Sequence, residues 1–163
     1  MLRRLVLTLG LVLLTACGQD SPTTTTSTTA NAQSARPSSA QSSSQPQNLD
    51  ADLRYLHRKD GDSFAVVWHG RETDIRLIGI NCPEKGEPGA EQARAFTHHW
   101  MQAGPVGLEY DQERFDRFGR VLAYVWRDGE MLNLELVRAG LCPPRYYRPN
   151  GAHRDDLEAA WPR

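Results

Sequence analysis

The sequence predicts a small α+β domain, mainly β, whose strands form a closed or nearly closed barrel. Three observations lead to this fold class. Aromatic and β-branched residues gather in short segments after residue 50, and turn signals rich in glycine and aspartate separate these segments. The predicted elements follow the order strand, strand, strand, helix, strand, strand, helix. Five strands with one intervening helix suit a small barrel.

Three short segments predict the first strands. LRYLHRK, residues 53–59, reads as the first strand, and DGDS, residues 60–63, is a turn signal. The β-branched and aromatic residues of FAVVWH, residues 64–69, predict the second. Gly70 begins a short connection to ETDIRLIGI, residues 72–80, so the second and third strands form a hairpin.

The apolar period then changes from that of a strand to that of a helix. Residues 89–104 are predicted to form an amphipathic helix that Gly104 ends, because apolar side chains recur every three or four positions, at Ala93, Phe96, Trp100 and Ala103. VGLEYD, residues 106–111, predicts the next strand. Residues 119–132 contain another, with Asp128-Gly129 as its hairpin turn.

Two shorter helices complete the predicted domain. NLELVRAGL, residues 133–141, reads as a helix with Asn133 as its N-cap and Gly140 near its end. HRDDLEAAW, residues 153–161, reads as a further short helix.

The N-terminal part predicts export and a lipid anchor. Residues 1–16 carry two arginines and an apolar run too short to span a bilayer comfortably, as in a signal peptide. The LTAC that ends at Cys17 resembles a bacterial lipobox, which predicts a lipid on Cys17 and a place in the bacterial cell envelope, facing the periplasm or the exterior. An ordinary secretory signal with an incidental cysteine is the alternative.

A tether is predicted to join this anchor to the folded domain. Residues 18–48 contain no leucine, isoleucine, valine or aromatic residue. Such a segment cannot bury enough apolar area to offset its chain entropy. The sequence therefore predicts a disordered tether over 17–49 and one folded domain over 50–163.

The two remaining cysteines fit an exported protein. Once Cys17 is assigned to lipid, Cys82 and Cys142 remain, and an oxidising compartment favours a disulfide between them. Two unpaired buried thiols are the alternative.

The charge balance argues against binding nucleic acid by bulk charge. The chain has 19 basic and 20 acidic residues and a formal net charge of −1, whereas proteins that bind nucleic acid in this way are basic. Any phosphate chemistry must come from a few local arginines.

Polar side chains of suitable types stand at the ends of several predicted elements. Carboxylate and amide oxygens suit calcium or magnesium, a carboxylate can take a proton from water, and arginines can fork onto a phosphate. The candidates are Asp60, Asp62, Arg76, Asn81, Glu84, Asp116, Arg117 and Arg120.

The motifs that carry these residues resemble a known family. DGDSFAV, RLIGINCPE, GAEQARAF, DRFGRVLAYV and LNLELVRAGL follow the order and spacing of staphylococcal-nuclease-like domains, the thermonucleases, over about residues 53–150. The resemblance implies an OB-fold, a five-stranded barrel with two to three helices. It also implies a monomer that hydrolyses DNA or RNA with Ca²⁺.

The resemblance also implies roles for single residues. Asp62 falls at a calcium-ligating aspartate, Asn81 at a position where a second metal-binding aspartate is usual, and Cys82 where a main-chain carbonyl meets the metal. Glu84 falls at the glutamate that activates water. Arg76 and Arg120 fall at the two arginines that hold the reacting phosphate.

The substrate pocket and the disulfide are placed in the same way. Tyr147 resembles a tyrosine that lines the nucleotide pocket, but the chain is one residue shorter there, so Tyr146 competes for the role; Arg117 is a further substrate-binding candidate. In the resembled fold the chain around Cys142 returns beside Cys82.

These inferences predict an exported, membrane-tethered, calcium-dependent nuclease. The alternative is a non-catalytic OB-fold module that binds nucleic acid or protein, because asparagine at position 81 removes a charge and weakens the metal site.

Overall fold

The protein is described here by a computed structural model over residues 45–162. These residues fall within one compact unit, Ala40–Arg163. The predicted signal peptide, the lipidated Cys17 and nearly all of the predicted tether lie outside the described residues. Within residues 45–162, every helix is too short or too polar to cross a membrane.

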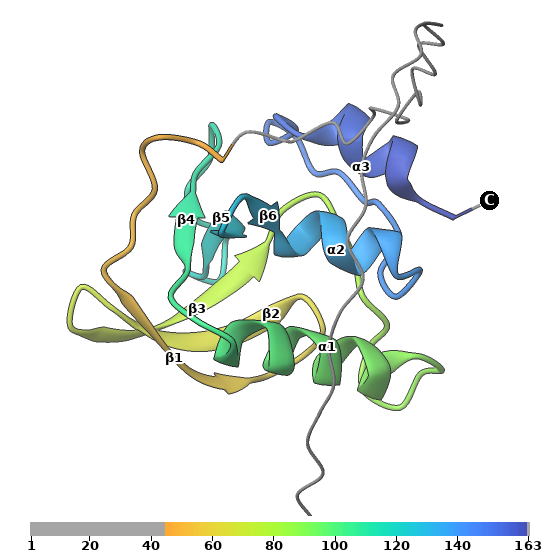
Figure 1. The fold of residues 1–163 in the computed structure, drawn as a ribbon, viewed down its shortest axis with the longest axis horizontal. Helices are drawn as coiled ribbons and strands as arrows, with labels where there is room; N and C mark the ends of the chain where they lie inside the picture. Colours follow the sequence, from red (N-terminus) through yellow and green to blue (C-terminus); the bar gives the residue numbers. More distant parts are fainter. Residues whose placement is uncertain (1–44, 163) are drawn as a thin grey trace, which may run out of the picture. The chain divides into compact units, whose positions relative to one another are not determined.

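The strands form one curled sheet of OB-fold topology (Figure 1). Their order is β1-β2-β3-β5-β4, all neighbours are antiparallel except the parallel pair β3 and β5, and β6 pairs with β5 at the side of this path. Two hydrogen bonds between Asp50 and Leu108 link the segment before β1 to β4 and so close the barrel. The predicted OB-fold is confirmed. The strands are β1 Leu53–Arg58, β2 Ser63–Trp68, β3 Arg71–Leu77, β4 Gly107–Glu109, β5 Val121–Arg127 and β6 Glu130–Met131.

Three helices pack on this barrel, as the sequence predicts. The first, α1 Ala90–Gln102, connects β3 to β4 and packs against β1 and α2. The second, α2 Leu132–Arg138, packs against β5 and against α3 Arg154–Ala160 (Figure 1). The core between strands and helices is fully buried and rich in large apolar side chains, among them Phe64, Ile75, Leu77, Leu108, Trp126, Leu132, Leu136 and Leu157.

The third strand is shorter than predicted. It ends at Leu77, because the left-handed Gly79 (φ 79°) turns the chain out of the sheet. Ile80 then pairs with Pro144, and Arg145 donates its N–H to the Gly79 carbonyl. This early exit places the residues after 78 beside the C-terminal segment instead of along β5.

Asn133 is not the N-cap of α2, so that prediction is wrong. Met131 occupies the cap, and Asn133 lies buried inside the first turn. Its Oδ1 accepts a hydrogen bond from Val125 N–H (3.1 Å), and its Nδ2 donates to the Ile78 carbonyl (2.8 Å). The amide therefore ties the helix to β5 and to the turn after β3.

A strap N-terminal to β1, residues 45–50, belongs to the folded unit. Leu49 packs so closely on Gly107 that a Cβ added there would lie 2.6 Å from the Leu49 Cβ. Gln45 accepts a hydrogen bond from Gly129 N–H. Contacts with the barrel thus extend back from Asp50 to Gln45.

The carboxylate of Asp50 holds the strap in place. It accepts hydrogen bonds from Trp68 Nε1 (2.9 Å) and Tyr110 Oη (2.7 Å), and it pairs with His69 Nε2 (2.9 Å) and Arg114 (3.6 Å). Burial alone would raise the pKa of Asp50, but the hydrogen bonds from Tyr110, Trp68 and His69 lower it to about 2.

The lowered pKa predicts that Asp50 contributes to acid stability. A carboxylate with a depressed folded-state pKa stabilises the fold above its unfolded value of 3.8, and this contribution is lost as pH falls from about 4 towards 2. Asp50→Asn should lower the free energy of unfolding by about 1–2 kcal/mol at neutral pH and flatten the loss below pH 4. Urea unfolding at several pH values checks this. Equal pH slopes for both proteins would contradict it.

Candidate functional site

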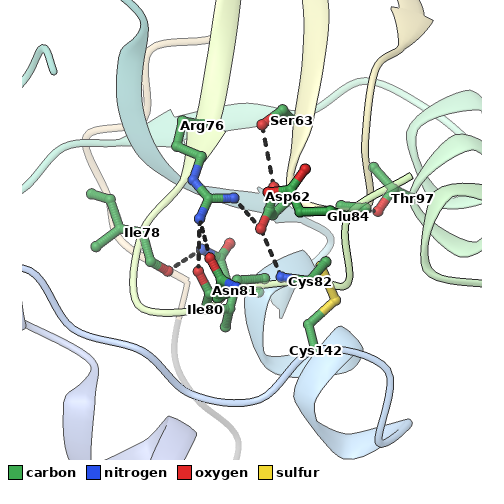
Figure 2. Close-up of polar contacts among 12 residues, drawn as sticks. Asp62, Ser63, Arg76, Ile78, Ile80, Asn81, Cys82, Glu84, Thr97 and Cys142 are labelled. Atoms are coloured by element: carbon green, nitrogen blue, oxygen red, sulfur yellow. Dashed lines mark hydrogen bonds and ion pairs between the residues drawn. A yellow bond between two sulfur atoms is a disulfide. The ribbon is translucent and has the colours of Figure 1, made fainter. Parts of the chain in front are cut away.

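The predicted polar residues gather where β3 leaves the sheet. Ser63, at the start of β2, pairs in register with Arg76 near the end of β3. Asp62 precedes β2, and Asn81 and Cys82 follow the turn after β3. Figure 2 shows the Arg76 side chain reaching from its strand towards Asp62 and towards the turn that carries Asn81.

Arg76 is the centre of this group. Its guanidinium forms an ion pair with Asp62 and donates through Nη2 to the Asn81 Oδ1 (3.1 Å) and the Ile80 carbonyl (3.3 Å). Its side chain is 14% exposed. A permanent cation therefore contacts the side-chain oxygens of two of the three predicted metal ligands.

Both carboxylate oxygens of Asp62 accept hydrogen bonds from neighbouring residues. Oδ2 accepts the Cys82 N–H (2.7 Å) as well as Arg76, and Oδ1 accepts the Ser63 hydroxyl (3.2 Å). The residue is buried, which suits a carboxylate only when it is paired and hydrogen-bonded. The turn after β3 is thereby fixed to the start of β2 (Figure 2).

A disulfide between Cys82 and Cys142 ties the same turn to the segment after α2. The two Cα atoms lie 4.2 Å apart, and both residues are buried. Gly61 packs against it: a Cβ there would lie 2.8 Å from the Cys82 Sγ and 2.6 Å from the Ala93 Cβ, so only glycine fits. The Asp-Gly-Asp turn, the helix α1 and the disulfide meet at this point.

Arg120 lies close enough to Arg76 for its charge to act on that residue. Asp116 orients it: Asp116 Oδ2 accepts from Arg120 Nε (2.7 Å), and Oδ1 accepts the main-chain N–H groups of Phe118 and Arg120. Burial raises the pKa of Asp116, but these hydrogen bonds outweigh it and lower the pKa, so the group stays ionised. Arg120 Nη1 lies 3.5 Å from the Ser63 hydroxyl.

Arg76 and Arg120 line one cavity of about 530 Å³. Burial and the charge of Arg120 lower the pKa of Arg76 from its usual value, although Tyr147, Glu84 and Asp116 oppose this. An arginine remains protonated at neutral pH. The two guanidinium groups repel each other in this cavity. A bound anion would offset that repulsion, so the cavity suits an anionic ligand.

Aromatic side chains stand at the rim of this cavity. Phe118 is 69% exposed and Tyr147 62% exposed, and both line the cavity together with Arg117. The guanidinium of Arg117 lies 4.7 Å from the centre of the Phe118 ring. A flat apolar face beside a cation suits a nucleotide base next to its phosphate.

Of the two competing tyrosines, Tyr147 lies at the cavity and Tyr146 does not. Tyr146 donates its hydroxyl to the Arg154 carbonyl (2.8 Å) and packs against the side chain of that residue. The Tyr146 side chain thus contacts α3, and of the two tyrosines only Tyr147 lines the cavity.

Glu84 is exposed and does not line the cavity. Its main-chain N–H donates to Glu87 Oε2 (2.7 Å), which shapes the turn. Its negative charge opposes the lowering of the Arg76 pKa. Asn81 and Cys82 face a second, shallower hollow of about 330 Å³.

The chemistry of the predicted metal ligands suits a hard cation. The Asp62 carboxylate, the Asn81 amide oxygen and the Cys82 carbonyl are all oxygen donors, as calcium prefers. Within residues 45–162, no three acidic, histidine or cysteine side chains cluster as a metal site. Asp62 supplies the one carboxylate among the three predicted ligands, and Arg76 already contacts it.

Sequence reasoning missed several residues of this site. Phe118 lies inside the DRFGR motif, and its position between two candidate arginines is the sequence signal that could have identified it as a site residue. Asn150 had no such signal: it is buried, and it bonds both the N–H and the carbonyl of Glu113, which lines the cavity. The sequence places Ser63 in a turn signal and gives no indication that its hydroxyl contacts Asp62.

Comparisons with known proteins show which family this chain resembles in sequence. The family model described as staphylococcal nuclease homologue matches residues 74–161. The chain is 37% identical to a thermonuclease of Staphylococcus hyicus over 107 residues, which cover 62% of this chain and 63% of that protein. It is also 37% identical to a thermonuclease of Staphylococcus intermedius, with 62% and 64% covered.

A third relative comes from another genus. The endonuclease YncB of Bacillus subtilis is 31% identical over 106 residues, which cover 60% of this chain and 50% of that protein. The chain thus spans less than two thirds of the length of these relatives. Because the family model matches more than half of its residues, the chain belongs to the staphylococcal nuclease homologue family.

Proposed function

We propose that this protein is a nuclease that hydrolyses phosphodiester bonds of DNA or RNA by attack of water. The observation that carries the proposal is the pair Arg76 and Arg120, whose charges share one cavity with aromatic side chains at its rim. The printed names of the relatives, thermonuclease and endonuclease, support it.

In the proposed reaction the two arginines hold the non-bridging oxygens of the phosphate. Their charges stabilise the negative charge that builds up in the transition state. Glu84 takes a proton from the attacking water, a bond forms from the water oxygen to phosphorus, and the bond to the leaving oxygen breaks. The leaving oxygen is protonated from solvent. Asp116 keeps Arg120 in position.

Calcium fits the proposed site through its oxygen donors. Asp62, Asn81 and the carbonyl of Cys82 would hold it. When bound, Ca²⁺ would act as a Lewis acid that polarises a phosphoryl oxygen. Asp62 would have to share its carboxylate between the ion and Arg76, which makes a weak site.

A cleavage assay tests the proposal. The purified chain is incubated with single-stranded DNA and with RNA, in calcium and in an excess of chelator. Cleavage in calcium that the chelator abolishes supports the proposal. No cleavage under either condition overturns it.

Asn81→Asp should tighten calcium binding by about tenfold, because it adds a carboxylate at a ligand position. Isothermal titration calorimetry measures the affinity. Gln102→Glu is the matched control, since it adds the same charge at an exposed position on α1. If the two variants bind alike, residue 81 does not face the ion.

A non-catalytic binding module is the second candidate. It is favoured by the ion pair of Asp62 with Arg76, which occupies the only carboxylate among the predicted ligands. Such a module would bind the strand in calcium and in chelator alike and leave it intact, so the cleavage assay separates the two candidates.

We also propose that the protein acts as a monomer that is exported and anchored to the bacterial envelope by a lipid on Cys17, facing the periplasm or the exterior. The disulfide supports export, since such bonds persist mainly in oxidising compartments. Mass spectrometry of the N-terminal peptide should find an acyl mass on Cys17. A cleaved, unacylated terminus would contradict the anchor.

A further inference from the structure

Aromatic surface continues beyond the phosphate cavity along the connection from β4 to β5. Among residues 45–162, three large hydrophobic side chains are exposed: Phe118 and Tyr147 line the cavity, and Phe115 does not. Phe115 is 47% exposed, three residues before Phe118. Its ring packs against Trp68 at the far end of β2, with centroids 6.4 Å apart and planes at 61°.

Hydrogen bonds fix the position of Phe115 relative to the cavity. Phe115 forms a bridge with Val121 at the start of β5, and Leu122 donates its N–H to the Arg114 carbonyl. The tip beyond it is closed by Asp116 N–H to the Arg120 carbonyl. The connection is thus a short antiparallel arm in which Phe115 lies one residue before the Asp116–Arg120 pair.

Cationic charge accompanies the aromatic faces. The guanidinium of Arg114 lies 3.9 Å from the centre of the Tyr110 ring and 5.2 Å from that of Trp68, and its side chain is 45% exposed. Stacking faces beside arginines are the arrangement that binds single-stranded nucleic acid.

Barrel closure explains part of this group but not all of it. Trp68, Tyr110 and Arg114 all contact Asp50 and so hold the strap. Phe115 takes no part in that network, and its exposed face has no structural use there. Phe115 is therefore the residue on which the inference rests.

The position of Phe115 next to the cavity sets which part of a ligand could reach it. Phe115 does not line the cavity, but its chain neighbour Asp116 does. A base on the exposed ring of Phe115 would therefore belong to a nucleotide beyond the one whose phosphate lies in the cavity. A single nucleotide bound in the cavity uses the faces of Phe118 and Tyr147 instead.

We propose that Phe115 and Trp68 form a second base-stacking site for an unpaired nucleotide of the strand whose phosphate lies between Arg76 and Arg120. The site rests on the proposed function and adds to it a preference for longer single strands. It lies outside the cavity, so it acts on strand affinity and not on the chemical step.

Binding of labelled thymidine nucleotides tests the site. The full chain carries Glu84→Gln to keep the strand intact, and fluorescence anisotropy measures affinity for a mononucleotide and for a strand of about 12 nucleotides. Phe115→Ala should weaken binding of the longer strand about tenfold and leave the mononucleotide unchanged. Phe115→Trp should restore binding, because it restores a stacking face.

A second measurement locates the contact. The longer strand should quench tryptophan fluorescence, and Trp68→Phe should remove most of that quenching. Equal affinities of Phe115→Ala and its parent for the longer strand overturn the site. So does an equal loss for both lengths, which would indicate a damaged fold.

The proposed function fails separately. If the wild-type chain cleaves neither substrate but Phe115 still controls binding of the longer strand, the protein is a binding module and the stacking site stands. If the parent binds neither length, the stacking site falls as well.

Discussion

Arg120→Ala should slow phosphodiester hydrolysis by about one hundred- to one thousandfold, the typical loss when one preorganised donor to a developing charge is removed. Arg120 shares the cavity with Arg76, and Asp116 holds it in place through its Nε. The loss should fall mainly on kcat, because the contact strengthens as charge develops on the phosphate. Steady-state kinetics on a single-stranded substrate in calcium measure it.

The control for Arg120→Ala is another arginine of the same barrel. Arg71 begins β3 at the end away from the cavity and is exposed, so Arg71→Ala removes the same charge and should retain full activity. Glu84→Gln should also be nearly inactive, because an amide takes up no proton from water. If Arg120→Ala and Glu84→Gln cleave at the wild-type rate, the proposed roles are wrong.

Loss of the Cys82–Cys142 disulfide should lower the free energy of unfolding by about 4 kcal/mol. The two residues are 60 positions apart, and a cross-link that closes a loop of this size removes that much chain entropy from the unfolded state. The double variant Cys82→Ala/Cys142→Ala tests this by urea unfolding. Both side chains are buried, so the truncation itself adds a small further loss.

The wild-type protein with reductant provides the comparison. Unfolding in reductant should bring the wild type close to the double variant, whereas the double variant should not respond to reductant. The folded double variant should also lose activity, since the disulfide supports the turn whose Cys82 N–H holds Asp62. A change in unfolding free energy below about 1 kcal/mol would contradict the loop-closure account.

Much of the fold could be predicted because its signals are local. The strands of the hairpin and the helix α1 carry their own periodicity, and the structure places them within a few residues of the predicted bounds. The strand count predicts a closed or nearly closed barrel, but not the bridge that closes it, because Asp50 and Leu108 lie far apart in the sequence. Asn133 was misassigned because a buried bond to Val125 outweighed its capping preference.

The site was predicted by residue type more than by geometry. The motif identified Arg76 as a cation near Asn81, but its contact with Asp62 depends on a strand pairing that sequence does not encode locally. Tyr146 and Tyr147 could not be separated either. Adjacent residues point in different directions, and only the docking of α3 decides which one lies at the cavity.

The strap from Gln45 to Asp50 also decides where a protease could release an intact domain. A cut before Gln45 would leave the contacts with Gly129, Gly107 and Leu108 in the released piece. A cut just after Asp50 would release a barrel that lacks the bridge to Leu108. Trp68 and Tyr110 would then lack the carboxylate that accepts their hydrogen bonds. The position of the cut relative to Asp50 thus decides whether the released domain keeps its closed barrel.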